Sequence, residues 1–160
     1  MRALRARAVV VLTLVAVGLA ALGLSACGGG SKQKSDAPAG STLTVSLKEW
    51  SVQVSAQQVK PGKVTFEVSN DGTMPHDFVV IKNDLPPNEL PVDADGRVIE
   101  SKVNTLGRVN AFPAGSKQTL TLDLTPGKYL LICNVVDTSG SSPVSHYATG
   151  MVASLLVSSS

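Results

Sequence analysis

The chain has 160 residues, of which 43% are hydrophobic and 16% charged, and its formal net charge is +2. This length suits a single domain of ordinary size. No basic residues cluster after Arg7, so the composition argues against a nucleic acid as the partner. Two cysteines are too few for a disulfide-stapled miniprotein or for a zinc site with four cysteines.

The N-terminus has the order of a secretory signal. Three arginines within the first seven residues precede an apolar run from Ala8 to Leu24. A membrane-spanning helix is the alternative, because an apolar run of this length is close to the lower limit for a span. Residues 24–27, Leu-Ser-Ala-Cys, resemble the lipobox of bacterial lipoproteins and favour the signal. The resemblance implies cleavage before Cys27 and attachment of fatty acids such as palmitate to its thiol and its new amino group.

These features divide the chain into three parts. Residues 1–26 are predicted to be a lipoprotein signal peptide, and residues 27–41 a lipidated, flexible tether rich in glycine, serine and lysine. A segment of that composition cannot bury enough apolar surface to order itself. Residues 42–158 are predicted to form one folded domain. We therefore expect an extracytoplasmic protein, anchored by lipid to the outer face of the cytoplasmic membrane.

Beyond the tether, short stretches alternate between apolar and polar residues, as strands with one buried face do. The expected strands cover residues 42–47, 50–54, 64–68, 77–81, 120–124, 128–133 and 152–157. The segment Lys82–Asn110 contains three prolines and the turn sequence Asp95-Gly96, so we expect loops there with at most one hairpin. Seven or eight short strands, separated by turn residues, indicate an all-β sandwich or barrel.

One cysteine and both histidines are the candidate functional residues. If Cys27 is lipidated, Cys133 is the only free thiol, and an unpaired thiol in an exported protein is buried and inert, bonded to another chain, or a metal ligand. His146 and Met151 follow Cys133 along the chain, and His76 comes after a turn sequence between two expected strands. Two histidines and a cysteine with a weak axial methionine are the ligands of blue copper sites.

Four segments then resemble one family, the cupredoxins, which are small type 1 blue copper proteins such as plastocyanin; sulfocyanin-like bacterial lipoproteins are the most similar among them. Residues 129–135 (Tyr-Leu-Leu-Ile-Cys-Asn-Val) and 146–151 (His-Tyr-Ala-Thr-Gly-Met) resemble the segment that carries the family's last three copper ligands. Residues 70–77 resemble the loop with the first histidine, and residues 126–129 the turn and strand before the cysteine.

The resemblance implies a Greek-key β-sandwich that holds one type 1 copper ion. The implied copper ligands are His76, Cys133, His146 and Met151. Asp77 and Asn134 match family positions that brace the ligand loops. These two roles and the ligand set come from the resemblance.

The chain departs from the family between the cysteine and the second histidine. Twelve residues separate Cys133 from His146, where the family usually has only a few. Loop length alone costs little, because closure entropy grows slowly. A short loop, however, fixes the imidazole relative to the thiolate, and the insertion at Val136–Ser145 removes that constraint. We expect the insertion to lie beside His146, in the rim where a partner docks.

The expected function is that of a membrane-tethered blue copper protein, a monomer that carries single electrons between extracytoplasmic redox partners such as a cytochrome or an oxidase. The alternative is a lipoprotein that carries or stores copper without transferring electrons. An enzyme is not expected, since two histidines are too few for the second copper centre of a multicopper oxidase or a nitrite reductase. A binuclear copper site would need a further cysteine near His146.

Overall fold

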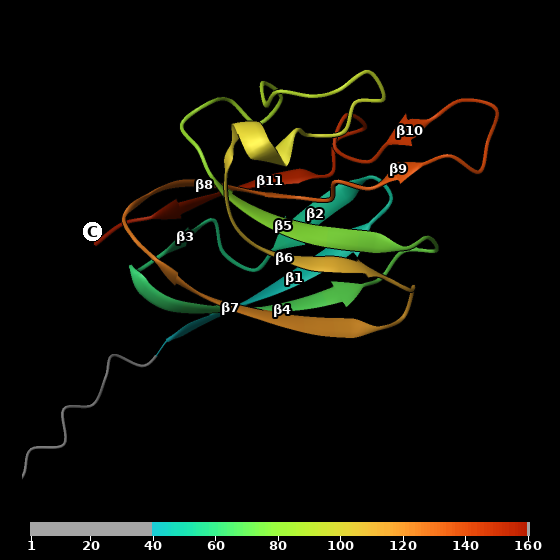
Figure 1. The fold of residues 1–160 in the computed structure, drawn as a ribbon. Helices are drawn as coiled ribbons and strands as arrows, with labels where there is room; N and C mark the ends of the chain where they lie inside the picture. The colour runs from blue at the N-terminus through green and yellow to red at the C-terminus, as the bar shows by residue number, and fades with distance from the viewer. Residues whose placement is uncertain (1–39, 160) are drawn as a thin grey trace, which may run out of the picture. The chain divides into compact units, whose positions relative to one another are not determined.

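The computed structural model describes residues 40–159, which fold into two β-sheets packed face to face (Figure 1). The predicted signal peptide, nearly all of the tether and the lipidation site at Cys27 lie outside the described residues. Within the described part, no helix is long and apolar enough to cross a membrane.

The first sheet has four strands in the order β2-β1-β4-β7. They are β1 (Ser41–Lys48), β2 (Ser51–Val54), β4 (Gly62–Asn70) and β7 (Lys117–Leu124). β1 runs parallel to β4 and antiparallel to β2, and β4 pairs with β7 in the antiparallel sense. Strict alternation places every second side chain of β1 and β4 in the core, as the sequence predicted.

The second sheet has five strands in the order β3-β11-β8-β5-β6. They are β3 (Gln58–Val59), β5 (His76–Lys82), β6 (Asn104–Phe112), β8 (Gly127–Ile132) and β11 (Val152–Val157). β9 (Val136–Asp137) and β10 (Val144–Ser145) form a separate antiparallel pair. A short 3-10 helix, η1 (Glu100–Lys102), lies in the connection between β5 and β6.

The core lies between the sheets and contains side chains from both. Phe66 of β4 and Phe78 of β5 are fully buried, and their ring centroids lie 5.4 Å apart. A second, smaller cluster covers the other face of β5 and β8, where Leu90 and Val98 from the long β5–β6 connection pack on Ile132. β5 is therefore buried on both faces, which explains its continuous run of apolar residues.

The predicted class, an all-β sandwich, is confirmed, but the number of strands is higher than the seven or eight expected. Among residues 40–159 the chain forms eleven strands, and three of these (β3, β9 and β10) have only two residues each. Two residues are too few to show an alternating pattern, so the sequence could not reveal them.

β6 is the one long strand that the sequence prediction did not place, and most of it lies in residues 82–110, where loops with at most one hairpin were expected. Much of β6 is exposed and only Phe112 at its end is buried, so apolar residues do not mark it. Gly107 in its middle packs closely: a Cβ atom there would lie 2.9 Å from Cδ2 of Leu122 on β7, so the leucine side chain would have to shift. The glycine lets this strand of one sheet lie close against a side chain of the other.

The strand order brings distant parts of the sequence to one end of the sandwich. β8 is antiparallel to both of its neighbours, β5 and β11. The end of β8 therefore lies beside the starts of β5 and β11. The residues that follow β8 and begin the two neighbouring strands form one neighbourhood, and these are the residues in which the sequence predicted a metal site.

Candidate metal centre

His76, Cys133 and His146 form a buried group that could hold a metal ion, and their donor atoms all lie within 4.8 Å of one another. The two Nδ1 atoms of the histidines are 3.1 Å apart. The sulfur of Cys133 lies 3.6 Å from Nδ1 of His76 and 3.3 Å from Nδ1 of His146. All three side chains are fully buried. Three donors from three separate segments thus meet at one point.

Each of these residues is placed by the end of a strand. His76 is the first residue of β5, and Cys133 comes directly after β8. His146 follows β10, and its backbone N–H donates to the carbonyl of Val135 at 2.9 Å. The backbone N–H groups of Cys133 and His146 are both hydrogen-bonded, which fixes where these two side chains start.

The loop before His76 is fixed by Asn70, a buried residue at the end of β4. Its side-chain amide donates to the carbonyls of Met74 and Phe112, both at 2.9 Å. Its side-chain oxygen accepts a hydrogen bond from the N–H of Gly72 at 3.1 Å. Asn70 thus fixes the turn internally and ties it to the end of β6, which sets where β5 and His76 begin.

Met151 is the residue that the sequence predicts as the fourth ligand. It is fully buried and comes directly before β11. Its carbonyl accepts a hydrogen bond from the N–H of Cys133 at 3.0 Å, and its N–H donates to the carbonyl of His146, also at 3.0 Å. The backbone of Met151 is therefore bonded to both neighbouring candidate ligands, and the structure brings all four predicted residues together.

The donor atoms have the spacing that a metal ion requires. A point equidistant from the sulfur and the two Nδ1 atoms lies about 2 Å from each, which is close to the bond lengths of a first-row metal to imidazole and thiolate. The donor types also fit copper: the thiolate suits Cu(I), and imidazole suits both oxidation states.

The protonation states agree with a site for a cation. Burial lowers the pKa of His76, against the opposing effect of the Glu49 carboxylate, and burial together with His76 lowers the pKa of His146. Both imidazoles are therefore neutral near pH 7, as ligands must be. Burial, with the nearby Asp77 carboxylate, raises the pKa of the Cys133 thiol. To act as a ligand, this thiol would have to give up its proton to a bound metal ion and become a thiolate.

Asp77 and Asn134 brace the ligand loops through hydrogen bonds. The carboxylate of Asp77 accepts from the backbone N–H of Asn134 at 2.6 Å and from the Arg108 guanidinium at 3.0 Å. The side chain of Asn134 exchanges two hydrogen bonds with the backbone of Val98, at 2.7 and 3.1 Å. The start of β5, the residue after Cys133 and the long connection are thereby tied together.

The long connection between β5 and β6 also supports the second histidine. The hydroxyl of Tyr147, next to His146, donates to the carbonyl of Pro87 at 2.7 Å and accepts from the N–H of Leu90 at 3.1 Å. No role was predicted for this connection. In the structure it covers the outer face of the sheet and holds both ligand-bearing segments from that side.

Two neighbouring residues at this centre were not predicted. Glu49 and Trp50 form the turn between β1 and β2. A carboxylate oxygen of Glu49 lies 3.2 Å from Nε2 of His76, and the Trp50 ring makes an edge-on contact with His146, with centroids 5.2 Å apart. The sequence had placed Trp50 in a half-buried strand, but its side chain is 41% exposed. The one feature of the sequence that could have drawn attention to Trp50 is that it is the only tryptophan of the chain.

The insertion between Cys133 and His146 forms a hairpin. β9 and β10 pair with Val136 opposite Ser145 and Asp137 opposite Val144, and the residues between them, 138–143, are exposed. Figure 1 shows this hairpin projecting beside the sandwich. Its base is fixed, because the hydroxyl of Ser145 donates to the carbonyl of Gly96 at 2.6 Å. The insertion therefore replaces a short loop by an anchored base with an exposed tip.

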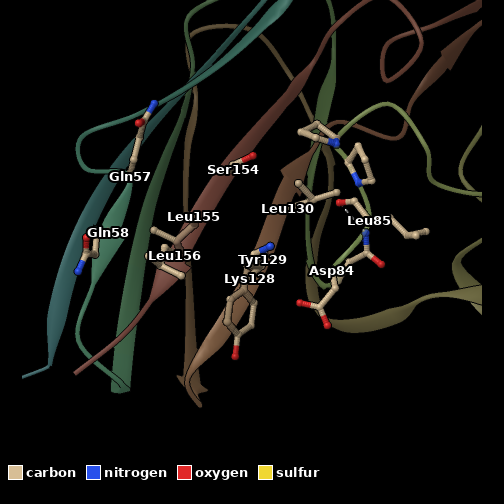
Figure 2. A pocket seen from close by; sticks show the side chains of 13 residues that line it. Gln57, Gln58, Asp84, Leu85, Lys128, Tyr129, Leu130, Ser154, Leu155 and Leu156 are labelled. Atoms are coloured by element: carbon tan, nitrogen blue, oxygen red, sulfur yellow. Dashed lines mark hydrogen bonds between the residues drawn. The ribbon is translucent and has the colours of Figure 1, made fainter. Parts of the chain in front are cut away.

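A pocket of about 770 Å³ lies away from this centre and contains none of the four candidate ligands. Figure 2 shows its lining, which includes Leu85, Tyr129 and Leu156. Leu156 and Lys128 are paired at the far ends of β11 and β8 from Met151 and Cys133. The candidate metal centre is therefore a buried cluster of side chains and not an open cavity.

Comparisons with known proteins identify the class. A family model described as the sulfocyanin (SoxE) domain matches residues 52–160. An NMR structure of reduced rusticyanin superposes with a TM-score of 0.54 at 19% identity, over 74% of this chain and 77% of that one. Rusticyanin from Thiobacillus ferrooxidans gives 0.51 at 17% identity, over 74% and 77%. Auracyanin A, a "blue" copper protein from Chloroflexus aurantiacus, gives 0.49 at 20% identity, over 75% and 100%. No curated protein sequence matches the chain.

The fold and the family model together define a cupredoxin, that is, a blue copper protein of the electron-transfer class. Its cofactor is one type 1 copper ion. Within that class the chain belongs to the sulfocyanin family, whose model covers more than half of its length. The resemblance inferred from the sequence is thus confirmed.

The exposed tip of the hairpin is expected to be dispensable for the fold. We predict that replacing Thr138–Pro143 by Asn-Gly leaves a two-residue turn between Asp137 and Val144, the connection that suits a paired hairpin. Closing the shorter loop changes the free energy of unfolding by no more than about 1 kcal/mol. Urea unfolding measures this change, and a loss of several kcal/mol would show that the tip is structural.

Proposed function

We propose that this chain binds its copper ion through Nδ1 of His76, the sulfur of Cys133 and Nδ1 of His146, with the thioether of Met151 as a weak axial ligand, and that it carries single electrons between extracytoplasmic redox proteins. The observation that carries the proposal is the buried triangle of three donor atoms, which has the size of a metal coordination sphere. The copper would supply the one-electron chemistry by cycling between Cu(I) and Cu(II).

The protein's part is to keep the ligands still. Little movement of the donors between the two oxidation states is an advantage in an electron carrier. The backbones of Cys133, His146 and Met151 are hydrogen-bonded to one another or to Val135. Asn134 links the segment after the cysteine to the β5–β6 connection. These contacts limit rearrangement around the ion.

A copper carrier or storage protein is the second candidate, because it could use the same ligands. Such a protein must release its ion to an acceptor, which is easier when ligands are exposed. Here both histidines, Cys133 and Met151 are fully buried. The burial favours retention of the ion and hence electron transfer. An enzymatic role finds no support, since both histidines of the chain are used at this one centre.

The position in the cell belongs to the proposal as well. The lipobox-like sequence ending at Cys27 supports cleavage, acylation and anchoring to the outer face of the cytoplasmic membrane. The residues between Cys27 and β1 would then give the copper domain its reach to partners such as a cytochrome or an oxidase.

Copper loading tests the function directly. We expect Cu(II) titrated into the chain to give an intense thiolate-to-copper band in the visible spectrum. Cys133→Ser is expected to abolish that band, because the thiolate provides the strong equatorial bond. Met151→Leu is expected to keep the copper and the band but to raise the reduction potential, because a weak axial donor is lost. Equal loss of copper in both variants would contradict an axial role for Met151, and weak colour with tight Cu(I) binding would favour a carrier.

The anchor is tested by a separate substitution. Cys27→Ala is expected to leave an uncleaved or mislocalised precursor, because the acylated thiol is missing. Metabolic labelling with a radioactive fatty acid and partition into detergent measure this outcome. A normal label and normal partition in the variant would refute the lipoprotein hypothesis, while copper binding by the domain should be unaffected in either case.

A further inference from the structure

We propose that Glu49 is the positioning residue for His76: its carboxylate accepts a hydrogen bond from Nε2–H of His76 and so keeps Nδ1 unprotonated and aimed at the copper. The proposal rests on the function proposed above and concerns a residue that the sequence did not single out. Imidazole carries one proton in its neutral form, so fixing it on Nε2 leaves Nδ1 as the free donor.

The geometry of the carboxylate supports this role. The Glu49 oxygen that lies 3.2 Å from Nε2 of His76 also accepts hydrogen bonds from the backbone N–H groups of Thr73 and Met74, both at 2.8 Å. The side chain of Glu49 is only 16% exposed and that of His76 is fully buried. The carboxylate is therefore held by the loop that carries His76 and cannot swing away without breaking three hydrogen bonds.

The neighbouring glycine leaves room for this contact. A Cβ atom on Gly72 would lie 2.6 and 2.7 Å from the two carboxylate oxygens of Glu49 and 2.8 Å from Nε2 of His76. Any larger residue would thus displace the acid, the imidazole or both. Gly72, in the Asn-Asp-Gly turn at residues 70–72, thus leaves space for Glu49 of the β1–β2 turn, although the two turns are far apart in the sequence.

A carboxylate at this position affects the metal more strongly than a neutral acceptor such as a carbonyl would. A negative partner on the outer nitrogen makes the imidazole a better donor and favours the more highly charged ion, Cu(II), over Cu(I). Loss of the carboxylate is therefore expected to weaken Cu(II) binding and to raise the reduction potential. Removal of such an outer partner typically costs about 10–100-fold in metal affinity.

The first experiment uses the metal-free chain. In Glu49→Ala, nitrogen NMR of His76 is expected to show loss of the pure Nε2–H tautomer. Glu49→Gln is expected to keep that tautomer, because its amide oxygen still accepts the hydrogen bond. Glu67→Gln, at an exposed position of β4, is the matched control. An unchanged tautomer in Glu49→Ala would overturn the proposal.

The second experiment loads the same variants with copper. Cu(II) affinity is expected to fall by about 10–100-fold in Glu49→Ala, and by less in Glu49→Gln. The potential is expected to rise in both and to stay unchanged in Glu67→Gln. Equal affinity and potential in all variants would overturn the proposal. Absence of a blue band in the unmodified chain would refute the proposed function instead, and the tautomer result would stand by itself.

The other histidine carries a second, independent inference: we infer that Trp50 is the side chain through which electrons pass between the copper and a partner. In the structure His146 is fully buried, and its Nε2 has no hydrogen-bond partner among the described residues. The Trp50 ring lies against it at an interplanar angle of 80° and is itself 41% exposed. A partner that docks here touches Trp50 and not the histidine.

Electron transfer through Trp50 can be tested with two copies of this chain, one with Cu(I) and one with Cu(II). The Cu(I) copy loses one electron and becomes Cu(II), and the Cu(II) copy gains that electron and becomes Cu(I). No proton moves, and Trp50 is unchanged at the end. This self-exchange needs no partner of unknown identity, and line broadening in NMR spectra of mixed oxidation states measures its rate.

Trp50→Ala is expected to slow self-exchange, while Trp50→Phe, which keeps an aromatic ring, retains most of the rate. Leu156→Ala is the matched control, since it removes a similarly exposed side chain at the far end of β11. The visible spectrum of each of these three variants is expected to match that of the unmodified chain. Tryptophan fluorescence reports on Trp50 alone, because it is the only tryptophan. Since its ring lies against His146, this fluorescence should be quenched when Cu(II) binds. Unquenched emission, or an unchanged self-exchange rate in Trp50→Ala, would overturn the inference.

Discussion

The burial of three metal donors in one small space is the constraint on which the rest of this structure depends. A thiol and two imidazoles away from water lose the hydrogen bonds that water would supply, and burial of polar groups costs free energy unless they find partners. A cation between the donors offsets the cost, so metal binding and the stability of this end of the sandwich are coupled.

The sandwich meets this constraint through strand order. β8 lies between β5 and β11 and is antiparallel to both. The end of β8, next to Cys133, therefore lies beside the starts of β5 and β11, next to His76 and Met151. Asn70 and Asn134, both buried, then use their side-chain amides to tie these segments to Phe112 and Val98. Buried amides at such positions rigidify a site because each bond that they make is costly to leave unmade.

The sequence predicted the ligand types and their order, because short strands with strict alternation and a Cys-His-Met series are local patterns. Trp50 and Glu49 could not be predicted, since their contacts depend on how the β1–β2 turn packs over the start of β5. β6 was missed for a similar reason: its partly exposed residues carry no periodic apolar signal, and Gly107 has a role only because Leu122 lies against it. Local patterns therefore singled out residues that the structure brings together, whereas tertiary packing determines what surrounds them.

The surroundings of the two histidines differ, and the difference suggests how the site divides its tasks. His76 has an anion on its outer nitrogen, held by backbone N–H groups of its own loop. His146 has an aromatic ring over it, and this ring reaches the solvent. An anionic partner acts on the charge of the bound ion, whereas an apolar ring can make contact with another protein without a large desolvation cost. Glu49 and Trp50 are adjacent in one turn and contact different histidines of the same centre. Glu49 thus tunes the metal through His76, and Trp50 faces the partner beside His146.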